Sequence, residues 1–300
     1  MPLAPHVIPY QGSKRKLAEQ ILVFADFEID TLYEPFAGSA AITLAAAVKR
    51  IAKKYVINDK LDSLSELWKL IINDPNLIAD QYREIWEGHV DDSYAHYLRI
   101  REIYNQNKSP AALLYLAARC VKNAVRFNAN GDFNQSPDKR RLGTHPDKFE
   151  RSALEVSRLL KGKTEVLSAN FRDAIHSATD KDCVYLDPPW QGTSTNRDQR
   201  YAHILNLQDL IDGLAELNQK HVPFMLSFDG TLGEKKYGEE LPEFLNLTRV
   251  ELNAGRSSQA TLLGRDDVTI ESLYLSSSLI AKSSSVKSSK AREEQLVMFS

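Results

Sequence analysis

The stretch TLYEPFAGSAAITLAAAVKRIAKKYVIND, residues 31–59, decides the fold. Its first part, TLYEPFAG (31–38), is typical of a short buried strand that ends at a glycine. The Ala-rich run 39–52 predicts a helix that starts near Ser39, and YVIND (55–59) predicts a second buried strand. A strand, a helix and a second strand in this order form the unit from which parallel sheets are built, so the stretch predicts an α/β protein.

The alternation of strands and helices extends to both sides of this stretch. Residues 13–25 predict a helix before it, and residues 61–71 predict a helix after it. The pattern resumes later with candidate strands at 164–171, 183–189 and 222–230, a candidate helix at 206–219, and a candidate closing β-hairpin formed by 248–253 and 271–276.

The residues between 62 and 161 depart from this alternation. Residues 75–125 are helical in pattern at nearly every position, and 125–146 are rich in Asn, Gly, Pro and basic residues, which is typical of a loop or hairpin. We therefore expect a mainly helical domain over residues 62–161. It would be inserted into one catalytic domain formed by residues 1–61 and 162–276.

Composition limits the classes of function. The chain has 300 residues, 43% of them hydrophobic, and a formal net charge of −2, so any nucleic-acid contact needs a local basic patch. Cys120 and Cys183 are far apart in the sequence and indicate neither a disulfide framework nor a zinc site. We expect a soluble intracellular protein, because no signal peptide and no apolar run of membrane-spanning length is found.

The turn FAGSA (36–40) lies between a predicted strand and a predicted helix. Gly38 permits close approach of the backbone to a ligand, and the carboxylate of Asp59, which ends the next strand, can accept both hydroxyls of a ribose. The motif G-x-G-x-x-G is absent, which disfavours a dinucleotide oxidoreductase. A nucleoside cofactor without pyrophosphate, such as S-adenosylmethionine, fits better, although an ordinary tight turn is the alternative.

Lys14, in PYQGSKRK (9–16), stands at a predicted helix start. A cation at this end opposes the helix dipole, so a role outside the helix is plausible. Lys14 could meet the carboxylate of a methionine moiety. The alternative is a solvated basic patch.

The segment LDPPW (186–190) ends a predicted buried strand. An ionised Asp187 can only accept hydrogen bonds, and the carbonyl of Pro188 is a second acceptor. Both together match an exocyclic amino group, and the ring of Trp190 can stack on a planar base. Acceptance of both amino hydrogens would expose the nitrogen lone pair to an electrophilic methyl group. The alternative is a turn at the strand end with a core Trp.

In this order the motifs resemble Dam-type (α-class) N6-adenine DNA methyltransferases over most of residues 8–276. The resemblance implies a Rossmann-like S-adenosylmethionine-dependent methyltransferase sheet with helices on both faces, and a target-recognition role for the helical insertion. The sequence departs from the family pattern at Ala40, usually Gly, at Trp190, usually Tyr, and at Asn170, where many relatives carry Asp. The matching motifs are YQGSKRKL, YEPFAGSAAITL, VIND, RFNANGDFN, LDPPW and MLSFDG.

The resemblance also implies site residues at the matching positions. The implied catalytic residues are Asp187, Pro188, Pro189 and Trp190. The implied cofactor-binding residues are Tyr10, Lys14, Glu34, Pro35, Phe36, Ala37, Gly38, Ser39, Asp59, Asn170, Phe171 and Asp187. No metal is implied.

Access to DNA is the remaining requirement, since a base inside a duplex must be flipped out before it can react. Basic and Asn side chains of the insertion are expected to contact phosphates and base edges, with Arg197 in a loop (196–201) beside the flipped base. Residues 255–265 resemble a late family motif without an assigned role. A solvated loop is the alternative for some members of the expected DNA-binding set, which is Arg119, Lys122, Asn123, Arg126, Asn128, Asn130, Lys139, Arg140 and Arg141.

These features predict transfer of the methyl group of S-adenosylmethionine to N6 of a flipped-out adenine in double-stranded DNA, by direct in-line attack. Methylation of cytosine C5 is rejected, because neither Cys120 nor Cys183 follows a proline. Asp rather than Ser at position 187 favours adenine over the amino group of cytosine. The alternatives are N4 of cytosine, adenine in RNA, and a non-catalytic DNA-binding protein with the same fold.

The expected partners are double-stranded DNA and a cognate restriction endonuclease, unless the enzyme is an orphan methylase. The Ser/Lys-rich residues 277–300 predict a flexible tail. Near its end, QLVMF (Gln295 to Phe299) resembles the pentapeptides that bind bacterial sliding clamps. A chance match is the alternative.

Overall fold

The structure, a computed structural model, describes most of the chain. The expectations for Trp190, Arg197 and Gln295 to Phe299 lie outside the described residues, as does most of the segment 255–265. The described residues are 4–89, 92–189, 205–232, 235–237, 241–256 and 268–284.

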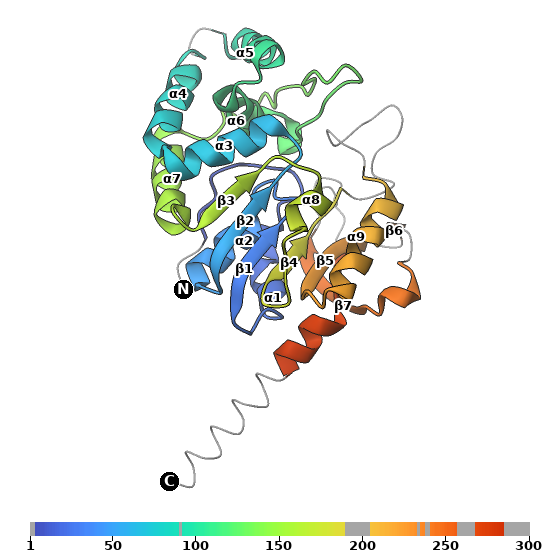
Figure 1. Cartoon of the computed structure of the whole chain (residues 1–300). Helices are drawn as coiled ribbons and strands as arrows, with labels where there is room; N and C mark the ends of the chain where they lie inside the picture. The colour runs from blue at the N-terminus through green and yellow to red at the C-terminus, as the bar shows by residue number, and fades with distance from the viewer. Residues whose placement is uncertain are drawn as a thin grey trace.

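One mixed sheet forms the centre of the described chain (Figure 1). Its strands follow the order β3-β2-β1-β4-β5-β8-β7, with β6 paired to β5 beside this path. The first five are parallel, and β8 and β7 continue antiparallel as the expected hairpin. The strands are β1 (Ile29–Glu34), β2 (Ala52–Asn58), β3 (Thr164–Leu167), β4 (Cys183–Leu186), β5 (Phe224–Leu232), β6 (Lys235–Tyr237), β7 (Thr248–Arg256) and β8 (Val268–Leu275).

Helices cover both faces of this sheet, which confirms the predicted Rossmann-like α/β fold (Figure 1). Strand β4 shows why: Cys183 and Tyr185 face one apolar cluster, while Val184 and Leu186 face the other. Strands buried on both faces are expected to be continuously apolar, as this one is. The first cluster includes α1 (Ala18–Leu22) and α2 (Ala41–Lys49), and the second includes α8 (Phe171–Ile175) and α9 (Leu207–Gln219).

Five further helices and a long loop lie together at one end of the sheet (Figure 1). Their buried aromatic side chains, among them Trp68, Tyr82 and Tyr104, belong to the same apolar cluster as residues of β1 and β2. The helical region therefore shares a core with the sheet, and the expected domain boundaries at 62 and 161 stay a prediction. The helices are α3 (Asp62–Asn73), α4 (Pro75–Glu87), α5 (Ser93–Asn107), α6 (Pro110–Arg119) and α7 (Pro146–Leu160).

Two local expectations were wrong. The helix expected over 13–25 is instead a short 3-10 turn, Lys14–Lys16, followed by α1. Ser13 does not cap it, because its hydroxyl accepts a hydrogen bond from Ser39. Residues 277–284, which were expected to begin a flexible tail, form a helix in which Leu279 is buried in the main core, and the rest of the expected tail lies outside the described residues.

Candidate active site

The motifs expected to bind the cofactor and the base converge at one edge of the sheet. Strand β1 pairs with both β2 and β4, all three parallel, so the loops after them begin side by side. These loops carry Gly38, Asp59 and Asp187. In open α/β sheets, ligands bind at the carboxyl ends of the strands, which is the edge these loops form.

Gly38 occupies a position that suits no other residue. Its φ of +49° lies in the left-handed region, and a Cβ added there would stand 3.2 Å from the ring of Tyr10. The backbone of the turn is fixed on both sides, because the Gly38 amide donates to Asp59 Oδ2 at 3.1 Å and its carbonyl accepts from Trp68 Nε1 at 3.0 Å. The backbone of the turn is therefore held in a fixed position, with the ring of Tyr10 packed against Gly38.

Asp59 connects this turn to the start of α3. Its Oδ1 accepts the backbone N–H of Leu61 at 3.0 Å, while Oδ2 accepts that of Gly38. Burial raises the pKa of Asp59, and the two N–H groups act in the opposite direction. A carboxylate has about four lone-pair sites, so two acceptor positions remain for ligand hydroxyls.

Glu34 has a structural task that the sequence did not reveal. Its buried carboxylate accepts the amides of Ile42 at 3.4 Å and Thr43 at 2.8 Å, in the first turn of α2. Glu34 thereby caps the helix, the task expected of Ser39, whose hydroxyl bonds Ser13 instead. Burial raises the pKa of Glu34 to about 7. Direct contact of Glu34 with a cofactor stays a prediction.

Asn58, which was not among the expected site residues, connects two loops of the edge. Its side-chain amide donates to the carbonyls of Pro35 at 2.9 Å and Ala169 at 3.2 Å, and its Oδ1 accepts the amide of Ala169 at 2.9 Å. Its backbone carbonyl accepts the amide of Ala37. A buried Asn at the end of an apolar strand was the signal in the sequence.

Two aromatic rings border the edge on the side of β3. Phe36 and Phe171 stack with their centroids 5.2 Å apart and an interplanar angle of 30°. Phe171 is only 3% exposed, whereas Phe36 is partly exposed. Asn170 is exposed and caps α8 through the Arg172 amide. Of these two implied cofactor residues, Phe36 is therefore the more accessible to a ring placed here.

Asp187 follows the last residue of β4, as the prolines predicted. Lys14 Nζ lies 2.8 Å from Asp187 Oδ1 and 3.6 Å from Glu271 Oε2, and Lys14 is only 7% exposed. Burial raises the pKa of Asp187 to about 6, opposed by Lys14 and reinforced by Glu271. Lys14 thus pairs with the expected catalytic carboxylate, and the sequence did not predict this ion pair. Glu271 was missed as well, although a Glu beside an apolar run in ESLYLS was a usable signal.

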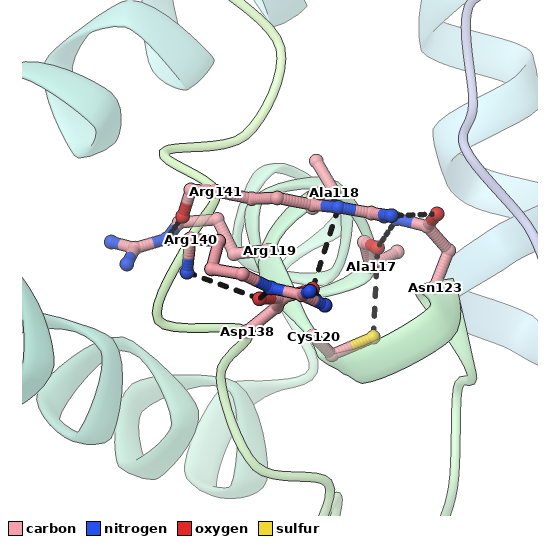
Figure 2. A network of polar contacts seen from close by, with 8 residues as sticks. All are labelled: Ala117, Ala118, Arg119, Cys120, Asn123, Asp138, Arg140 and Arg141. Atoms are coloured by element: carbon pink, nitrogen blue, oxygen red, sulfur yellow. Dashed lines mark hydrogen bonds and ion pairs between the residues drawn. The ribbon is translucent and has the colours of Figure 1, made fainter. Parts of the chain in front are cut away.

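The basic cluster expected to bind DNA divides into a buried or engaged group and an exposed group. Figure 2 shows the polar contacts around Arg119, Asn123, Arg140 and Arg141. Arg119 is 2% exposed and donates to the carbonyl of Arg141, to Ser93 and to Tyr115, so its assignment to the DNA surface was wrong. Asn123 is also engaged, because its amide donates to the carbonyls of Ala117 and Ala118 at the end of α6 while its Oδ1 accepts from Arg141.

Asn128 is likewise engaged in the loop itself. Its Oδ1 accepts the amides of Asn130 and Asp132, both at 2.9 Å, as in an Asx turn. Asn123 and Asn128 therefore hold the loop in shape, and base reading by their side chains would require them to give up these bonds. Asn130 remains exposed at the tip.

The other group is exposed. Arg140 and Arg141 flank the carboxylate of Asp138 at 3.2 and 3.4 Å yet remain 78% and 49% exposed. Lys122 and Lys139 are exposed as well, and Arg126 is half-buried. The exposed basic surface, defined here as Lys122, Lys139, Arg140 and Arg141, is the part of the predicted cluster that is available to a phosphate backbone.

Two absences apply to the described residues alone. No group of three or more His, Cys, Asp or Glu side chains is arranged there to hold a metal ion. None of the helices in the same ranges has the length and apolarity to cross a membrane.

The Gly38 turn, the carboxylate of Asp59 and the turn from Asp187 to Pro189 therefore lie at one edge of a mixed α/β sheet, an arrangement that fits the class of methyltransferases that the motifs resemble. The comparison with known families is specific. The family model of the D12 class N6 adenine-specific DNA methyltransferases matches residues 10–254, and the chain belongs to this family. The resemblance noted from the motifs is thereby confirmed.

Curated relatives agree with this family. The chain is 27% identical over 232 residues to Modification methylase StsI of Streptococcus sanguinis, covering 73% of this chain and 34% of that relative. It is 25% identical over 276 residues to Type II methyltransferase M.FokI of Planomicrobium okeanokoites, covering 88% and 42%. It is 24% identical over 272 residues to Type II methyltransferase M1.LlaDCHI of Lactococcus lactis subsp. cremoris, covering 85% and 90%. The chain thus spans less than half the length of the first two relatives.

Proposed function

We propose that the protein is an S-adenosylmethionine-dependent DNA methyltransferase that modifies N6 of a flipped-out adenine in double-stranded DNA. The observation that carries the proposal is the position of Asp187, a partly exposed carboxylate paired with Lys14 at the same sheet edge as the Gly38 turn and Asp59. Membership of the D12 class N6 adenine-specific DNA methyltransferases supports the choice of adenine.

The described residues fit the cofactor. The turn at Gly38 is held in a fixed position by Asp59, Asp59 keeps acceptor capacity for the ribose hydroxyls, and the partly exposed ring of Phe36 can pack on the adenine moiety. When bound, the cofactor supplies an electrophilic methyl group on a sulfonium. The backbone of Pro35 to Ser39 and the side chains of Tyr10 and Asn170 complete the proposed cofactor site.

Asp187 and the carbonyl of Pro188 would accept the two hydrogens of the adenine amino group, with Pro189 stiffening the turn and Trp190 stacking on the base. Both acceptors pull the nitrogen toward a pyramidal shape, which directs its lone pair at the methyl group. Attack would be direct and in line: the nitrogen–carbon bond would form as the carbon–sulfur bond of the sulfonium breaks, which leaves a thioether, and the surplus proton of the amino group would pass to the carboxylate of Asp187. This role requires Asp187 in its ionised form.

The pH dependence of turnover follows from this requirement. Because the pKa of Asp187 is raised to about 6, we expect the rate to fall as pH drops through that value, not through the ordinary range near 4. Single-turnover rates, measured as a function of pH with saturating cofactor and DNA, locate this fall, which is the acidic limb of the pH profile. Since Lys14 lowers the pKa of Asp187, Lys14→Met should move the limb to higher pH. A wild-type rate that holds constant down to about pH 4 would contradict the assignment.

The exposed basic surface predicts the salt dependence of DNA binding. Lys122→Gln and Lys139→Gln should each lower the slope of log affinity against log salt by about 0.9, whatever the DNA sequence. Fluorescence anisotropy with a labelled duplex measures the slope. Lys54→Gln, an exposed site on β2 away from the helical region, is the matched control and should change nothing. Slopes equal to wild type in both test variants would remove these residues from the DNA surface.

Residues 62–161 would supply target recognition, and we place the enzyme with DNA in the cytoplasm. A cognate restriction endonuclease is proposed because the relatives named above are called modification or Type II methyltransferases. A sliding clamp is a further proposed partner, carried only by the sequence QLVMF (295–299). A peptide of residues 290–300 that shows no heat of binding to the clamp would end that proposal.

The substrate class is tested by competition between nucleic acids. Tritiated methyl transfer from S-adenosylmethionine should label duplex DNA, with single-stranded DNA and RNA of the same sequence labelled weakly. Preferential labelling of RNA would overturn the proposed substrate. Cofactor binding without any transfer would favour the non-catalytic DNA-binding alternative.

A further inference from the structure

One lysine ammonium serves two carboxylates beside the proposed reacting group. Lys14 Nζ is 2.8 Å from Asp187 Oδ1 and 3.6 Å from Glu271 Oε2. All three side chains are largely shielded from water, with exposed fractions of 7% for Lys14, 18% for Asp187 and 16% for Glu271. Lys14 Nζ also donates to the carbonyl of Gly12 at 3.3 Å. The group therefore holds two negative charges and one positive charge in a low-dielectric environment.

Glu271 is placed for this contact by the sheet. It lies on β8 between Gly230 of β5 and Leu252 of β7, at the point where the register of β5 shifts by a bulge. Leu273, two residues further along β8, is buried in the main apolar core, so Glu271 points to the face occupied by that core. Bulges of this kind redirect side chains and are frequent beside active sites.

The hydrogen bonding of Glu271 is unusual for a residue with only a packing role. Its Oε2 is buried and makes no hydrogen bond, and the ammonium of Lys14 at 3.6 Å is beyond normal hydrogen-bond distance. A buried carboxylate without hydrogen bonds costs free energy unless a cation is near it. Lys14 is that cation, but in this arrangement it is closer to Asp187.

In the proposed reaction, the carboxylate of Asp187 would have to accept a hydrogen bond from the adenine amino group. The ammonium of Lys14, a strong donor, competes for the same carboxylate in the structure. With Asp187 as its sole carboxylate partner, Lys14 could leave only by separating a largely buried ion pair, which is costly. Glu271 offers a second carboxylate, at 3.6 Å from Nζ compared with 2.8 Å for Asp187, and the flexible lysine stem can cover the difference.

We propose that Glu271 is a positioning residue for methyl transfer: it is the alternative partner that lets Lys14 move off Asp187 when the amino group of the flipped base binds. The inference rests on the proposed function and extends it to a residue outside the motifs. Glu271 touches neither base nor cofactor in this account, and it acts through Lys14.

The proposal predicts that Glu271→Gln changes the single-turnover rate in opposite directions in the two backgrounds of a double-mutant cycle. In the wild-type background, Glu271→Gln holds Lys14 on Asp187, so the single-turnover rate should fall about tenfold while the affinities for DNA and cofactor stay within about threefold. In the Lys14→Met background, Glu271 is an uncompensated negative charge beside Asp187. There Glu271→Gln should raise the rate, because it relieves this repulsion.

Two further variants separate positioning from packing. Glu271→Asp keeps the charge and should restore part of the rate lost in Glu271→Gln. Glu251→Gln, an exposed site on the same hairpin with 63% of its side chain accessible, is the matched control and should leave the rate unchanged. If Lys14→Met does not fold, Lys14→Gln provides the same background.

Thermal unfolding at neutral pH gives a readout that needs no substrate. Glu271→Gln should raise the unfolding midpoint of the Lys14→Met protein by about 2 °C or more, and should leave the wild-type midpoint unchanged or lower. A rate loss of equal size in both backgrounds, or none in the wild type, would overturn the inference. If the wild-type protein transfers no methyl group, the proposed function is overturned, and the positioning role with it. The unfolding midpoints of the single and double variants would still decide whether Glu271 and Lys14 interact.

Discussion

Asp187→Ala is expected to lower the rate of methyl transfer by about 100-fold or more, the loss typical when a preorganised polar contact to the reacting group is removed. Without the carboxylate, the amino nitrogen keeps its lone pair in the base π-system and is a poor nucleophile. Binding of DNA and of cofactor should change little, because most contacts to both are made elsewhere. The comparison of single-turnover rates measures the effect.

The Asp187→Ala protein should remain folded. Its side chain stands at the end of β4 and is partly exposed, and Lys14 retains Glu271 as an ionic partner. Asp80→Ala, a change at an exposed site on α4, is the matched control and should keep the wild-type rate. Transfer near the wild-type rate in a folded Asp187→Ala protein would end the catalytic assignment.

Asp59→Ala is expected to weaken cofactor binding by roughly 100-fold. The variant would lose the two proposed ribose contacts, each worth about 1.5 kcal/mol when the acceptor is charged, and tenfold in affinity corresponds to about 1.4 kcal/mol. It also releases the amides of Gly38 and Leu61, so the turn that faces the cofactor loses its fixed position. Isothermal titration with S-adenosylmethionine measures the dissociation constant.

Asp59→Asn separates the loss of the ribose contacts from the loss of the hydrogen bonds that hold the turn. Its Oδ1 can still hold one backbone amide, but its NH₂ group cannot accept from a ribose hydroxyl or from the second amide. Its affinity should fall between wild type and Asp59→Ala. If both variants bind the cofactor as wild type does, the ribose site lies elsewhere.

Periodicity and turn chemistry in the sequence predicted the sheet well, because these signals are local. Strand β4 ends at Leu186 just before Asp187 and the prolines, and β7 and β8 form the expected hairpin. The helix over 13–25 was wrong for a tertiary reason: Ser13 is bound by Ser39, a residue 26 positions away. The helical continuation at 277–284 was missed because one buried Leu279 outweighs a Ser-rich composition.

Site residues were harder to predict wherever their partners are distant in the sequence. The types of residue at Gly38, Asp59 and Asp187 pointed to their chemistry, but nothing local indicated that Lys14 pairs with Asp187, or that Glu271 from the last strand joins them. Arg119 illustrates the converse error. A basic residue in a basic segment suggests DNA contact, whereas burial against Tyr115 and Ser93 assigns it to the interior.

The central claim is tested most directly by the chemical identity of the methylated nucleoside. DNA treated with the protein and labelled S-adenosylmethionine is digested to nucleosides and analysed by mass spectrometry. The account predicts that the label appears in N6-methyldeoxyadenosine, and that DNA treated with Asp187→Ala contains little of it. Label in N4-methyldeoxycytidine would contradict the proposed base, and DNA without label, under conditions in which the protein binds both cofactor and duplex, would contradict the enzymatic function itself.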